Sequence, residues 1–446
     1  MTPGSDTALA GRAQEIVGPP HLLTAAASLA PYAIDGVRPL AVARPETPEE
    51  TAALLAAAGE TGAAVFPWGA GAHQHLGATP PRVDLVVDTS RQVGITDYTP
   101  ADYVVAVRAG TPLRDLQTAL AANRQWVPLD PPGAAAATVG GLVAANRNGP
   151  RRLLWGSIRD MVIGLRVALP TGEVIKAGGK VVKNVAGYDL TKLFIGSLGS
   201  AGIITEATFK ISPQPDEGLT LLVTVPDLTA AHALTTAVLR SYLLPSALEA
   251  ANPAALRRLA GAAGIGDPSA GAWGVLLLAE GLEESRTRHL TEIQTLVAGR
   301  GRLDVLRGAA HDALWTAVAE FPSPATHAGA VVCRAGGPIA RWADLVRALE
   351  AAPAASRPVE IVAHAGSGLL YAACAAEDGV GMAEALGRAA AETGGYAVVE
   401  AAPPALKPRL PLWGAPPGGL ELMRRLRRAY DPRGIMVPGR LGWGLS

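Results

Sequence analysis

Two widely separated glycine-rich segments constrain this chain more than any other feature. The first is Trp68-Gly-Ala-Gly-Ala-His-Gln-His-Leu-Gly77, and the second runs from Gly178 to Pro213 as GGKVVKNVAGYDLTKLFIGSLGSAGIITEATFKISP. Glycine allows positive φ angles and has no Cβ to hold a ligand away from the backbone. Tight turns alone would explain one such cluster. Two clusters beside strand-like segments, in the same half of the chain, predict a large cofactor that is approached by bare backbone.

The length and charge of the chain narrow the class of protein. A chain of 446 residues is too long for one small core, so two domains are expected. The hydrophobic fraction of 49% and the charged fraction of 17% are typical of a globular protein. Because the formal net charge is zero, neither nucleic acid nor an anionic membrane is expected as the main partner.

The cysteine content restricts the metal chemistry. The chain has two cysteines, Cys333 and Cys374, and no C-x-x-C motif. It therefore cannot supply the ligands of an iron–sulfur cluster or a Cys₄ zinc site, and a disulfide framework is excluded.

Residues 1–18 contain no apolar run of the signal-peptide type, and no segment is long and apolar enough to span a membrane. We expect a cytoplasmic protein with no direct membrane span, or one held at the inner membrane through a partner.

The first domain is expected to span residues 36–213 as a mixed α+β unit, after a weakly patterned and partly ordered lead-in at 1–35. Thr47 can cap a helix that starts with Pro48, and Thr111-Pro112 repeats this signal for a second helix. The other expected elements are strands at 63–67, 84–88, 103–107, 161–169, 174–176 and 203–211, and a helix at 192–195.

A proline-rich polar linker, Ser212-Pro-Gln-Pro-Asp-Glu-Gly218, precedes a second domain that is expected to span residues 219–402 and to cap the substrate. Strands and helices alternate in this domain, which predicts a sheet with helices on one face, and no sequence repeat is visible. Residues 403–446, with one expected helix at 420–430, are expected to return to the first domain. The expected cap strands are 219–225, 273–279, 329–334, 359–363, 369–373 and 396–400, and the expected cap helices are 229–240, 282–298, 339–351 and 382–393.

The first glycine segment does not fit the common nucleotide-binding motifs. A Rossmann fingerprint needs a third glycine and a helix after Gly69-x-Gly71, but Gln74 and a Thr-Pro-Pro sequence follow. No Walker A sequence is present. What remains is a loop whose consecutive backbone N–H groups bind an anion.

The segment 36–213 resembles the FAD-binding domain of the vanillyl-alcohol oxidase and p-cresol methylhydroxylase family. Within that family it is most similar to the FAD-binding subunit of bacterial glycolate oxidase. The motifs that carry the resemblance are Arg44-Pro-Glu-Thr-Pro-Glu-Glu50, Trp68-Gly-Ala-Gly-Ala72, Asp130-Pro-Pro-Gly133, Thr138-Val-Gly-Gly-Leu142, Gly149-Pro-Arg-Arg152, Trp155-Gly156, Asp160, Lys183-Asn-Val-Ala-Gly-Tyr-Asp-Leu190 and Gly196-Ser-Leu-Gly-Ser-Ala-Gly-Ile-Ile-Thr-Glu206.

The resemblance implies an α+β fold class, in which a two-part FAD-binding domain is joined to an α/β cap domain. FAD would place its diphosphate against the N–H groups of residues 69–73 and its ring near Thr138 and the strand at 203–204, where backbone donors can reach the ring. The cofactor residues implied in this way are Gly69, Ala70, Gly71, Ala72, His73, Pro131, Thr138, Gly140, Gly141, Gly156, Asp160, Gly202, Ile203 and Ile204.

The chain departs from the family pattern at several positions. Ser200-Ala201 replaces Thr-Leu, and Val437 replaces the asparagine of a closing Asn-Pro-Gly-Lys/Arg sequence, which weakens any flavin contact at residue 437. Some relatives attach FAD covalently through a histidine in the first loop. Here Ala72 stands at that position and His73 follows it, so we expect non-covalent FAD.

The cap contains an eroded motif in the segment from Val359 to Tyr371, VEIVAHAGSGLLY. It resembles the His-Ala-Gly-Asp-Gly-Asn-x-His motif of the catalytic flavin subunit of glycolate oxidase and of D-lactate dehydrogenases. Ser367, Leu369 and Tyr371 replace the Asp, Asn and last His. A metal site needs several ligands, so no metal is expected. The segment is then a strand with a tight turn, or His364 serves as a proton acceptor.

Two interpretations are open for each of the remaining candidate residues. His73 and His75 face solvent or line the flavin site. The other pairs are His327 and Arg334, which bind a carboxylate or lie at the surface, and Lys180 and Lys183, which serve FAD or form salt bridges. Oxidation of a 2-hydroxy acid needs a base for the hydroxyl proton and a cation for the carboxylate. The sequence does not identify this catalytic pair.

The resemblance implies an FAD-dependent oxidoreductase for a small 2-hydroxy acid such as glycolate. Because the chain lacks a metal centre of its own, electrons from reduced FAD must pass to oxygen or to a partner. By the same resemblance, the expected partners are a second flavoprotein subunit and an iron–sulfur subunit. Two alternatives stay open: a stand-alone dehydrogenase or oxidase for another hydroxy acid or alcohol, and a largely non-catalytic subunit that keeps the fold for assembly.

Overall fold

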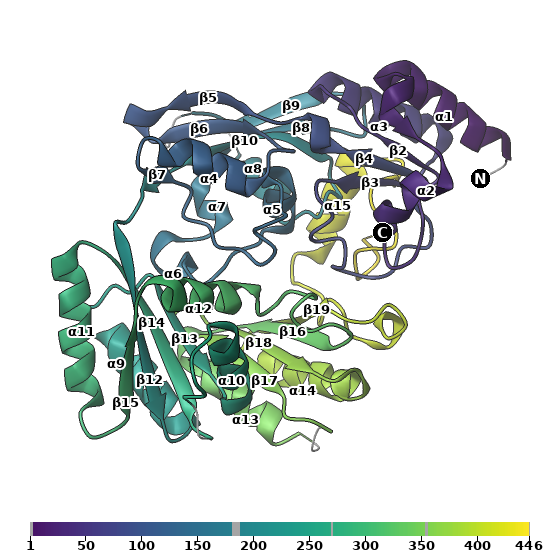
Figure 1. Ribbon diagram of the computed structural model, residues 1–446. Helices are drawn as coiled ribbons and strands as arrows, with labels where there is room; N and C mark the ends of the chain where they lie inside the picture. Colours follow the sequence, from purple (N-terminus) through teal and green to yellow (C-terminus); the bar gives the residue numbers. More distant parts are fainter. Residues whose placement is uncertain (1–2, 181–187, 269–270, 353–355, 446) are drawn as a thin grey trace.

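The computed structural model describes residues 3–180, 188–268, 271–352 and 356–445. Figure 1 shows two bodies: the N-terminal half of the chain together with the yellow C-terminal segment lies above, and an eight-stranded sheet with its helices lies below. On this grouping we propose to keep the division into residues 36–213, 219–402 and 403–446.

A small four-stranded sheet lies at the N-terminal end of the upper body, with the strand order β1-β2-β4-β3. Helix α1 (Pro3–Val17) packs against α3 (Pro48–Thr61), and the side chains of Leu9, Ala13 and Val17 are buried. The expectation of a partly ordered lead-in is therefore wrong, because apolar residues four apart form one buried stripe of a helix. The strands are β1 (Leu22–Leu23), β2 (Ala41–Ala43), β3 (Val65–Trp68) and β4 (Leu85–Asp88), and a short helix α2 spans Ala26–Leu29.

The two expected helix starts behave differently. The Thr47 hydroxyl accepts a hydrogen bond from the Glu50 N–H at 3.0 Å, which confirms the predicted cap of α3. The Glu50 carboxylate accepts from the Glu46 N–H at 2.7 Å, so the capping box is displaced by one residue. The Thr111 hydroxyl accepts instead from the Gly94 N–H at 2.9 Å, and α4 has no side-chain cap. The predicted Thr111 cap is therefore wrong.

A five-stranded antiparallel sheet, ordered β5-β6-β10-β8-β9, forms the rest of the upper body. Helices α4, α5, α7 and α8 bury apolar side chains against it, while α3 joins it to the small sheet. The predicted strands at 161–169 and 203–211 are confirmed. The elements are β5 (Ile95–Thr99), β6 (Val104–Arg108), α4 (Leu113–Ala121), β7 (Gln125–Trp126), α5 (Val139–Ala145), α6 (Arg152–Trp155), α7 (Ile158–Met161), β8 (Val162–Ala168), β9 (Val174–Gly178), α8 (Thr191–Phe194), β10 (Ile203–Lys210) and β11 (Ser212–Pro213).

The cap is an eight-stranded antiparallel sheet with helices on both faces, so the expectation of one covered face is wrong. Leu221 and Val223 of β12 pack in one core with α9, α11, α13 and α14, whereas Leu222 packs in another with α10 and α12. The cap strands are β12 (Glu217–Val225), β13 (Ala247–Ala251), β14 (Trp273–Gly281), β15 (Arg302–Leu306), β16 (Val331–Gly336), β17 (Glu360–His364), β18 (Leu369–Cys374) and β19 (Tyr396–Ala401). The helices are α9 (Leu228–Arg240), α10 (Pro253–Ala262), α11 (Glu283–Val297), α12 (Gly308–Glu320), α13 (Trp342–Glu350) and α14 (Gly379–Glu392).

The cap sheet is built from two halves of the same topology. The strand order is β15-β12-β14-β13 in one half and β17-β18-β16-β19 in the other. Numbered from its own first strand, each half runs 4-1-3-2, with a helix after the first strand and another after the third, as in a β-α-β-β-α-β unit. The first half has one more helix, α10, between its second and third strands. A structural repeat is therefore present where no sequence repeat is visible.

The C-terminal segment returns to the upper body and pairs with β3. The Val65 N–H donates to the Ile435 carbonyl at 2.8 Å, and the Val437 N–H donates to the Val65 carbonyl at 2.9 Å. Helix α15 (Leu420–Tyr430) precedes this contact, and the carboxylate of Asp431 accepts hydrogen bonds from the N–H groups of Ile435 and Met436.

In the described part of the chain, no helix has the length and apolar character needed to cross a membrane.

Candidate functional site: a cavity beside the first glycine loop

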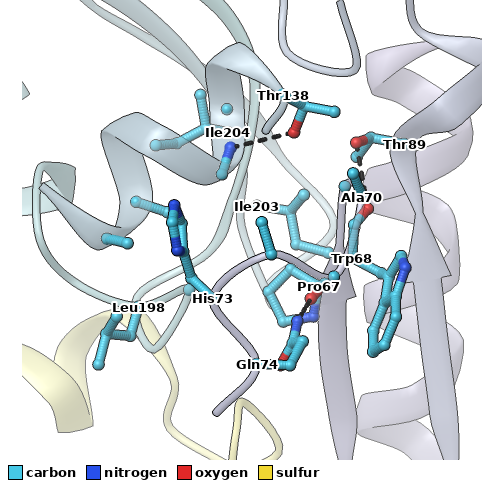
Figure 2. Close-up of a pocket in the computed structure, with 18 of the residues that line it drawn as sticks. Pro67, Trp68, Ala70, His73, Gln74, Thr89, Thr138, Leu198, Ile203 and Ile204 are labelled. Atoms are coloured by element: carbon cyan, nitrogen blue, oxygen red, sulfur yellow. Dashed lines mark hydrogen bonds between the residues drawn. The ribbon is translucent and has the colours of Figure 1, made fainter. Parts of the chain in front are cut away.

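A cavity lies between the first glycine loop, the start of α5, the loop before β10 and the C-terminal segment (Figure 2). The C-terminal segment contributes Val437 and Arg440 to the lining, and the loop before β10 contributes Leu198 and Gly199. The residues of the predicted cofactor set that line it are Gly69, Ala70, Gly71, Ala72, His73, Thr138, Gly140, Gly141, Gly202, Ile203 and Ile204.

The first glycine loop is fixed by hydrogen bonds at both ends. The Thr89 hydroxyl donates to the Trp68 carbonyl at 3.2 Å, and the Gln74 amide donates to the Pro67 carbonyl at 2.8 Å (Figure 2). Between them, the backbone N–H groups of residues 70–73 donate to no acceptor within the described ranges. A run of unpaired N–H groups facing a cavity is suited to an anion such as a diphosphate.

The glycines of this site also allow the chain to pack closely on itself. Gly71 has a φ angle of +74°, and a Cβ there would lie 2.5 Å from the Trp68 ring. A Cβ on Gly69 would lie 2.1 Å from Thr138 Oγ1, and a Cβ on Gly140 would lie 2.6 Å from the Ala109 Cβ. The hypothesis that the glycines form tight turns and the hypothesis that they approach a cofactor are therefore compatible, because close packing of these segments shapes the wall of the cavity.

Three predicted residues lie elsewhere. Pro131 lines a separate depression at the junction with the cap. The Asp160 carboxylate accepts from the Ser157 N–H at 2.8 Å and from the Ser157 hydroxyl at 2.7 Å, which caps α7, and Gly156 packs beside it with φ +81°. The structure gives Gly156 and Asp160 a local role in starting this helix and does not bring them to the cavity.

His73 and His75 are both half-buried; His73 lines the cavity, whereas His75 is not among the residues that line it. Burial is the largest cause that lowers the pKa of His73 to about 3, and Arg147 and His75 add to it. Burial and Arg147 lower the pKa of His75 to about 4. Both ring nitrogens of His73 and Nε2 of His75 are buried without a hydrogen-bond partner in the described part of the protein. Both rings are therefore neutral at neutral pH.

Two arginines and one glutamate connect the upper body to the cap. Glu400 of β19 is 1% exposed and accepts hydrogen bonds from Arg147, which follows α5, and from Arg334 of β16. Burial alone would raise the pKa of Glu400, but Arg147 and Arg334 lower it to about 2. With two cations for one carboxylate, this buried cluster carries a net positive charge.

The eroded cap motif lies beside that cluster. The His364 and Tyr371 rings are 5.1 Å apart, and His364 Nδ1 lies 3.6 Å from Glu249 Oε1. Burial lowers the pKa of His364 to about 3, with Arg152 and Arg334 as further causes, and burial raises the pKa of Glu249 well above its usual value. Among the described residues, no group of three or more His, Cys, Asp or Glu side chains could hold a metal ion.

Sequence reasoning missed Arg147, Glu249 and Glu400, which carry no local motif. Of the other candidates, Arg334 belongs to the buried cluster, whereas His327 lies 3.9 Å from Glu360 and packs on Phe321. Lys180 forms an ion pair with Asp97, in agreement with the salt-bridge reading. Lys183 lies outside the described residues.

Comparisons with known families identify the family of the chain and its cofactor. The family described as "FAD binding domain" matches residues 39–178, and the family described as "FAD linked oxidases, C-terminal domain" matches residues 214–401 and 413–441. An uncharacterized FAD-linked oxidoreductase of Mycobacterium tuberculosis (strain H37Rv) is 32% identical over 97% of this chain and 98% of its own length. This chain belongs to the FAD-linked oxidases. Its cofactor is FAD, as predicted, and the unpaired N–H groups beside the cavity suit the diphosphate of that cofactor.

The other similarities agree with this assignment. The glycolate oxidase subunit GlcD of Bacillus subtilis is 29% identical over 90% of this chain and 89% of that subunit. The glycolate oxidase subunit GlcE of Escherichia coli K12 is 42% identical over a shorter stretch, 32% of this chain and 41% of that subunit. The solved structure of p-cresol methylhydroxylase superposes with a TM-score of 0.74 over 99% of this chain and 97% of that chain, at 16% identity. The predicted fold class is confirmed.

Proposed function

We propose that this FAD-linked oxidoreductase oxidises a small 2-hydroxy acid such as glycolate, as one subunit of a glycolate oxidase-like complex. The observation that supports an anionic substrate is the buried cluster of Arg147, Arg334 and Glu400. Its two guanidinium groups face one carboxylate, so one unit of positive charge remains uncompensated at a largely buried site, where the Arg147 side chain is 6% exposed and the Arg334 side chain 27% exposed. Such a site favours an anion far more strongly than a neutral alcohol.

Different residues of the chain would bind the diphosphate, contact the flavin ring and accept the substrate proton. The backbone of residues 70–73 would hold the diphosphate, and the backbone at Gly202, Ile203 and Ile204 would meet the flavin ring. When bound, FAD supplies the acceptor for the two electrons of the substrate C–H bond. His73 and His364 keep buried ring nitrogens without partners and are the candidates to accept the hydroxyl proton.

We also propose that FAD is bound non-covalently, because residue 72 is alanine at the position where relatives that attach FAD covalently have a histidine. Precipitation of the pure protein with trichloroacetic acid should leave a colourless pellet and a yellow supernatant. A yellow pellet would contradict this proposal.

The subunit assignment follows the relatives that are named as glycolate oxidase subunits. Cys333 and Cys374 are both buried and cannot build an iron–sulfur cluster, so electrons must leave the flavin for oxygen or for a partner. We propose a second flavoprotein subunit and an iron–sulfur subunit as these partners, and a cytoplasmic complex that reaches the inner membrane only through a partner.

The decisive experiment is a visible spectrum of the purified protein followed by anaerobic addition of glycolate and, separately, D-lactate. Bleaching of the flavin bands by one of them supports the proposed reaction and identifies the donor. A flavin that neither acid reduces, alone or with the co-purified partners, contradicts it. Arg425→Gln on the exposed face of α15 serves as a control that should bleach like the natural protein, and Arg334→Met should bleach slowly.

A second candidate is a flavin-carrying assembly subunit with little catalysis. Its support is that Glu400 already accepts from both arginines and that Ser367, Leu369 and Tyr371 replace the polar residues of the cap motif. Bound FAD that no hydroxy acid reduces would favour this candidate. Turnover by the isolated chain with a soluble dye as acceptor would instead favour a stand-alone dehydrogenase.

A further inference from the structure

A buried group of three charged side chains lies behind the first glycine loop. Asp35 Oδ2 is 2.6 Å from Lys407 Nζ and 3.5 Å from Arg440 Nη1. The three side chains are 8%, 3% and 6% exposed, in the order Asp35, Lys407 and Arg440. Two of them come from the C-terminal segment and one from a position before β2, so only the fold brings them together (Figure 1).

This group has one more positive charge than negative charge. The remaining partners of the two cations are neutral carbonyl oxygens: Lys407 donates to His75 at 2.8 Å, and Arg440 donates to Gln74 at 2.6 Å and to Ala78 at 3.2 Å. Asp35 is the carboxylate that opposes both cations. Burial lowers the pKa of Arg440 to about 10, with Asp35 acting in the opposite direction, so Arg440 stays protonated at neutral pH.

The uncompensated charge lies at the cofactor cavity. Arg440 lines the cavity together with residues 69–74, and its guanidinium is tied to the end of the glycine segment by its hydrogen bonds to the Gln74 and Ala78 carbonyls. A buried cation is costly unless an anion offsets it. Residues 70–73, whose N–H groups have no acceptor among the described residues, line the same cavity and suit the same kind of ligand.

We propose that Arg440, held in place by Asp35 and Lys407, is the charged half of the FAD diphosphate site. The backbone N–H groups of the glycine loop supply the neutral half. This inference rests on the FAD site of the proposed function. It adds a role for the C-terminal segment, because Arg440 of that segment would bind the diphosphate directly. The preferred ligand is then a flavin that carries a diphosphate, rather than riboflavin.

Binding of FAD and of riboflavin to the apoprotein, followed by flavin fluorescence, tests the proposal without measuring turnover. Arg440→Gln should weaken FAD binding by about tenfold or more and leave riboflavin binding unchanged within about twofold. Asp35→Asn keeps Arg440 and removes the opposing charge, so it should tighten FAD binding and again leave riboflavin unchanged. ADP should compete with FAD in the natural protein and more weakly in Arg440→Gln. Arg425→Gln, an exposed arginine of α15, is the matched control and should bind both flavins normally.

Equal losses of FAD and riboflavin affinity in Arg440→Gln, with no gain in Asp35→Asn, would overturn the proposal and leave Arg440 as a structural tie. Unchanged FAD affinity in both variants would overturn it as well. If Arg440→Gln does not fold, Asp35→Asn alone decides, because a charge effect requires tighter FAD binding. A natural protein that binds neither flavin contradicts the FAD proposal itself, which is a different failure from the loss of discrimination between the two flavins.

Discussion

Arg147 and Glu400 form a buried ion pair that joins the FAD-binding half of the chain to the cap. Arg147 follows the short helix α5 at the cofactor cavity, and Glu400 lies in β19 at the edge of the cap sheet. Because Arg334 shares the same carboxylate, loss of Glu400 would leave the buried guanidinium of Arg147 and the partly buried guanidinium of Arg334 without this counter-charge. The pair therefore couples the position of the cap to the cavity in the FAD-binding half.

Glu400→Gln should lower the free energy of unfolding by about 3–5 kcal/mol, since one partner of a buried ion pair is removed and the other stays. Chemical denaturation followed by fluorescence would measure this. The matched control is Glu360→Gln, which breaks the more exposed pair with Arg258 and should cost less than about 1 kcal/mol. Equal costs for the two substitutions would contradict the special role of the Arg147–Glu400 pair.

The same carboxyl predicts a dependence of stability on pH. Arg147 and Arg334 lower the pKa of Glu400 to about 2 against the effect of burial, so its folded pKa lies below its unfolded value of 4.5. Its contribution is therefore fully present above pH 4.5 and is lost as the pH falls through the interval down to about 2. The free energy of unfolding should decrease by on the order of 3 kcal/mol over this interval because of Glu400. In Glu400→Gln the total decrease over this interval should be smaller by this amount; an unchanged decrease would contradict the assignment.

Gly71→Ala should weaken FAD binding by about tenfold or more and destabilise the protein. The added Cβ meets a left-handed backbone with φ +74° and would lie 2.5 Å from the Trp68 ring, so the loop has to move. Gly62→Ala is the matched control, because Gly62 has φ +66° and no atom within 4 Å of the added Cβ. It should cost about 1 kcal/mol of stability and leave FAD affinity unchanged. If both substitutions left FAD affinity unchanged, the loop at residues 69–73 would not be the cofactor loop.

At Val437 the glycine variant should be at least as stable as the alanine variant, which is the reverse of the usual order of stability. It is a buried β-branched residue with φ +41°, beside the cavity, where the family pattern has asparagine. Glycine adopts positive φ without the cost of about 1–2 kcal/mol that alanine incurs. Val437→Gly should therefore be at least as stable as Val437→Ala. At Val42, a strand residue of the same apolar cluster, the glycine variant should be less stable than the alanine variant by about 0.5–1 kcal/mol. The same order at both positions would show that residue 437 is not strained.

The success of sequence reasoning depends on whether a signal is local. Thr47-Pro48 specifies the start of α3, and Gly71 is read correctly as a turn, because caps and positive φ angles are properties of a few neighbouring residues. The missing asparagine at Val437 is visible in the sequence, but its meaning is not: the position needs a left-handed backbone, which asparagine tolerates and valine does not favour.

The residues that sequence reasoning missed make their contacts across long separations. Glu400 pairs with Arg147, and Lys407 pairs with Asp35, although neither pair has a recognisable spacing. The helices on the second face of the cap were missed for a related reason. Leu221, Leu222 and Val223 are all buried, and a continuous apolar strand indicates two covered faces, whereas alternation of strand and helix along the chain says nothing about which face each helix covers.

Activity should not depend on an added divalent metal. His364 is the surviving polar residue of the cap motif, and Tyr371 stands where the motif has a second histidine. The nearest carboxyl to His364 is that of Glu249, whose pKa is raised well above its usual value by burial, which disfavours the charged form that a metal needs. A divalent metal needs several deprotonated ligands at one point, and this set offers one imidazole. Treatment with EDTA should therefore leave the rate of FAD reduction and the melting temperature unchanged, and Zn²⁺ should not raise the melting temperature. Tyr371→His brings a second imidazole to His364 and Glu249 and is the positive control, in which Zn²⁺ should stabilise the protein. Loss of FAD reduction after EDTA, restored by Zn²⁺ or Mn²⁺ in the natural protein, would show that the eroded motif still binds a metal.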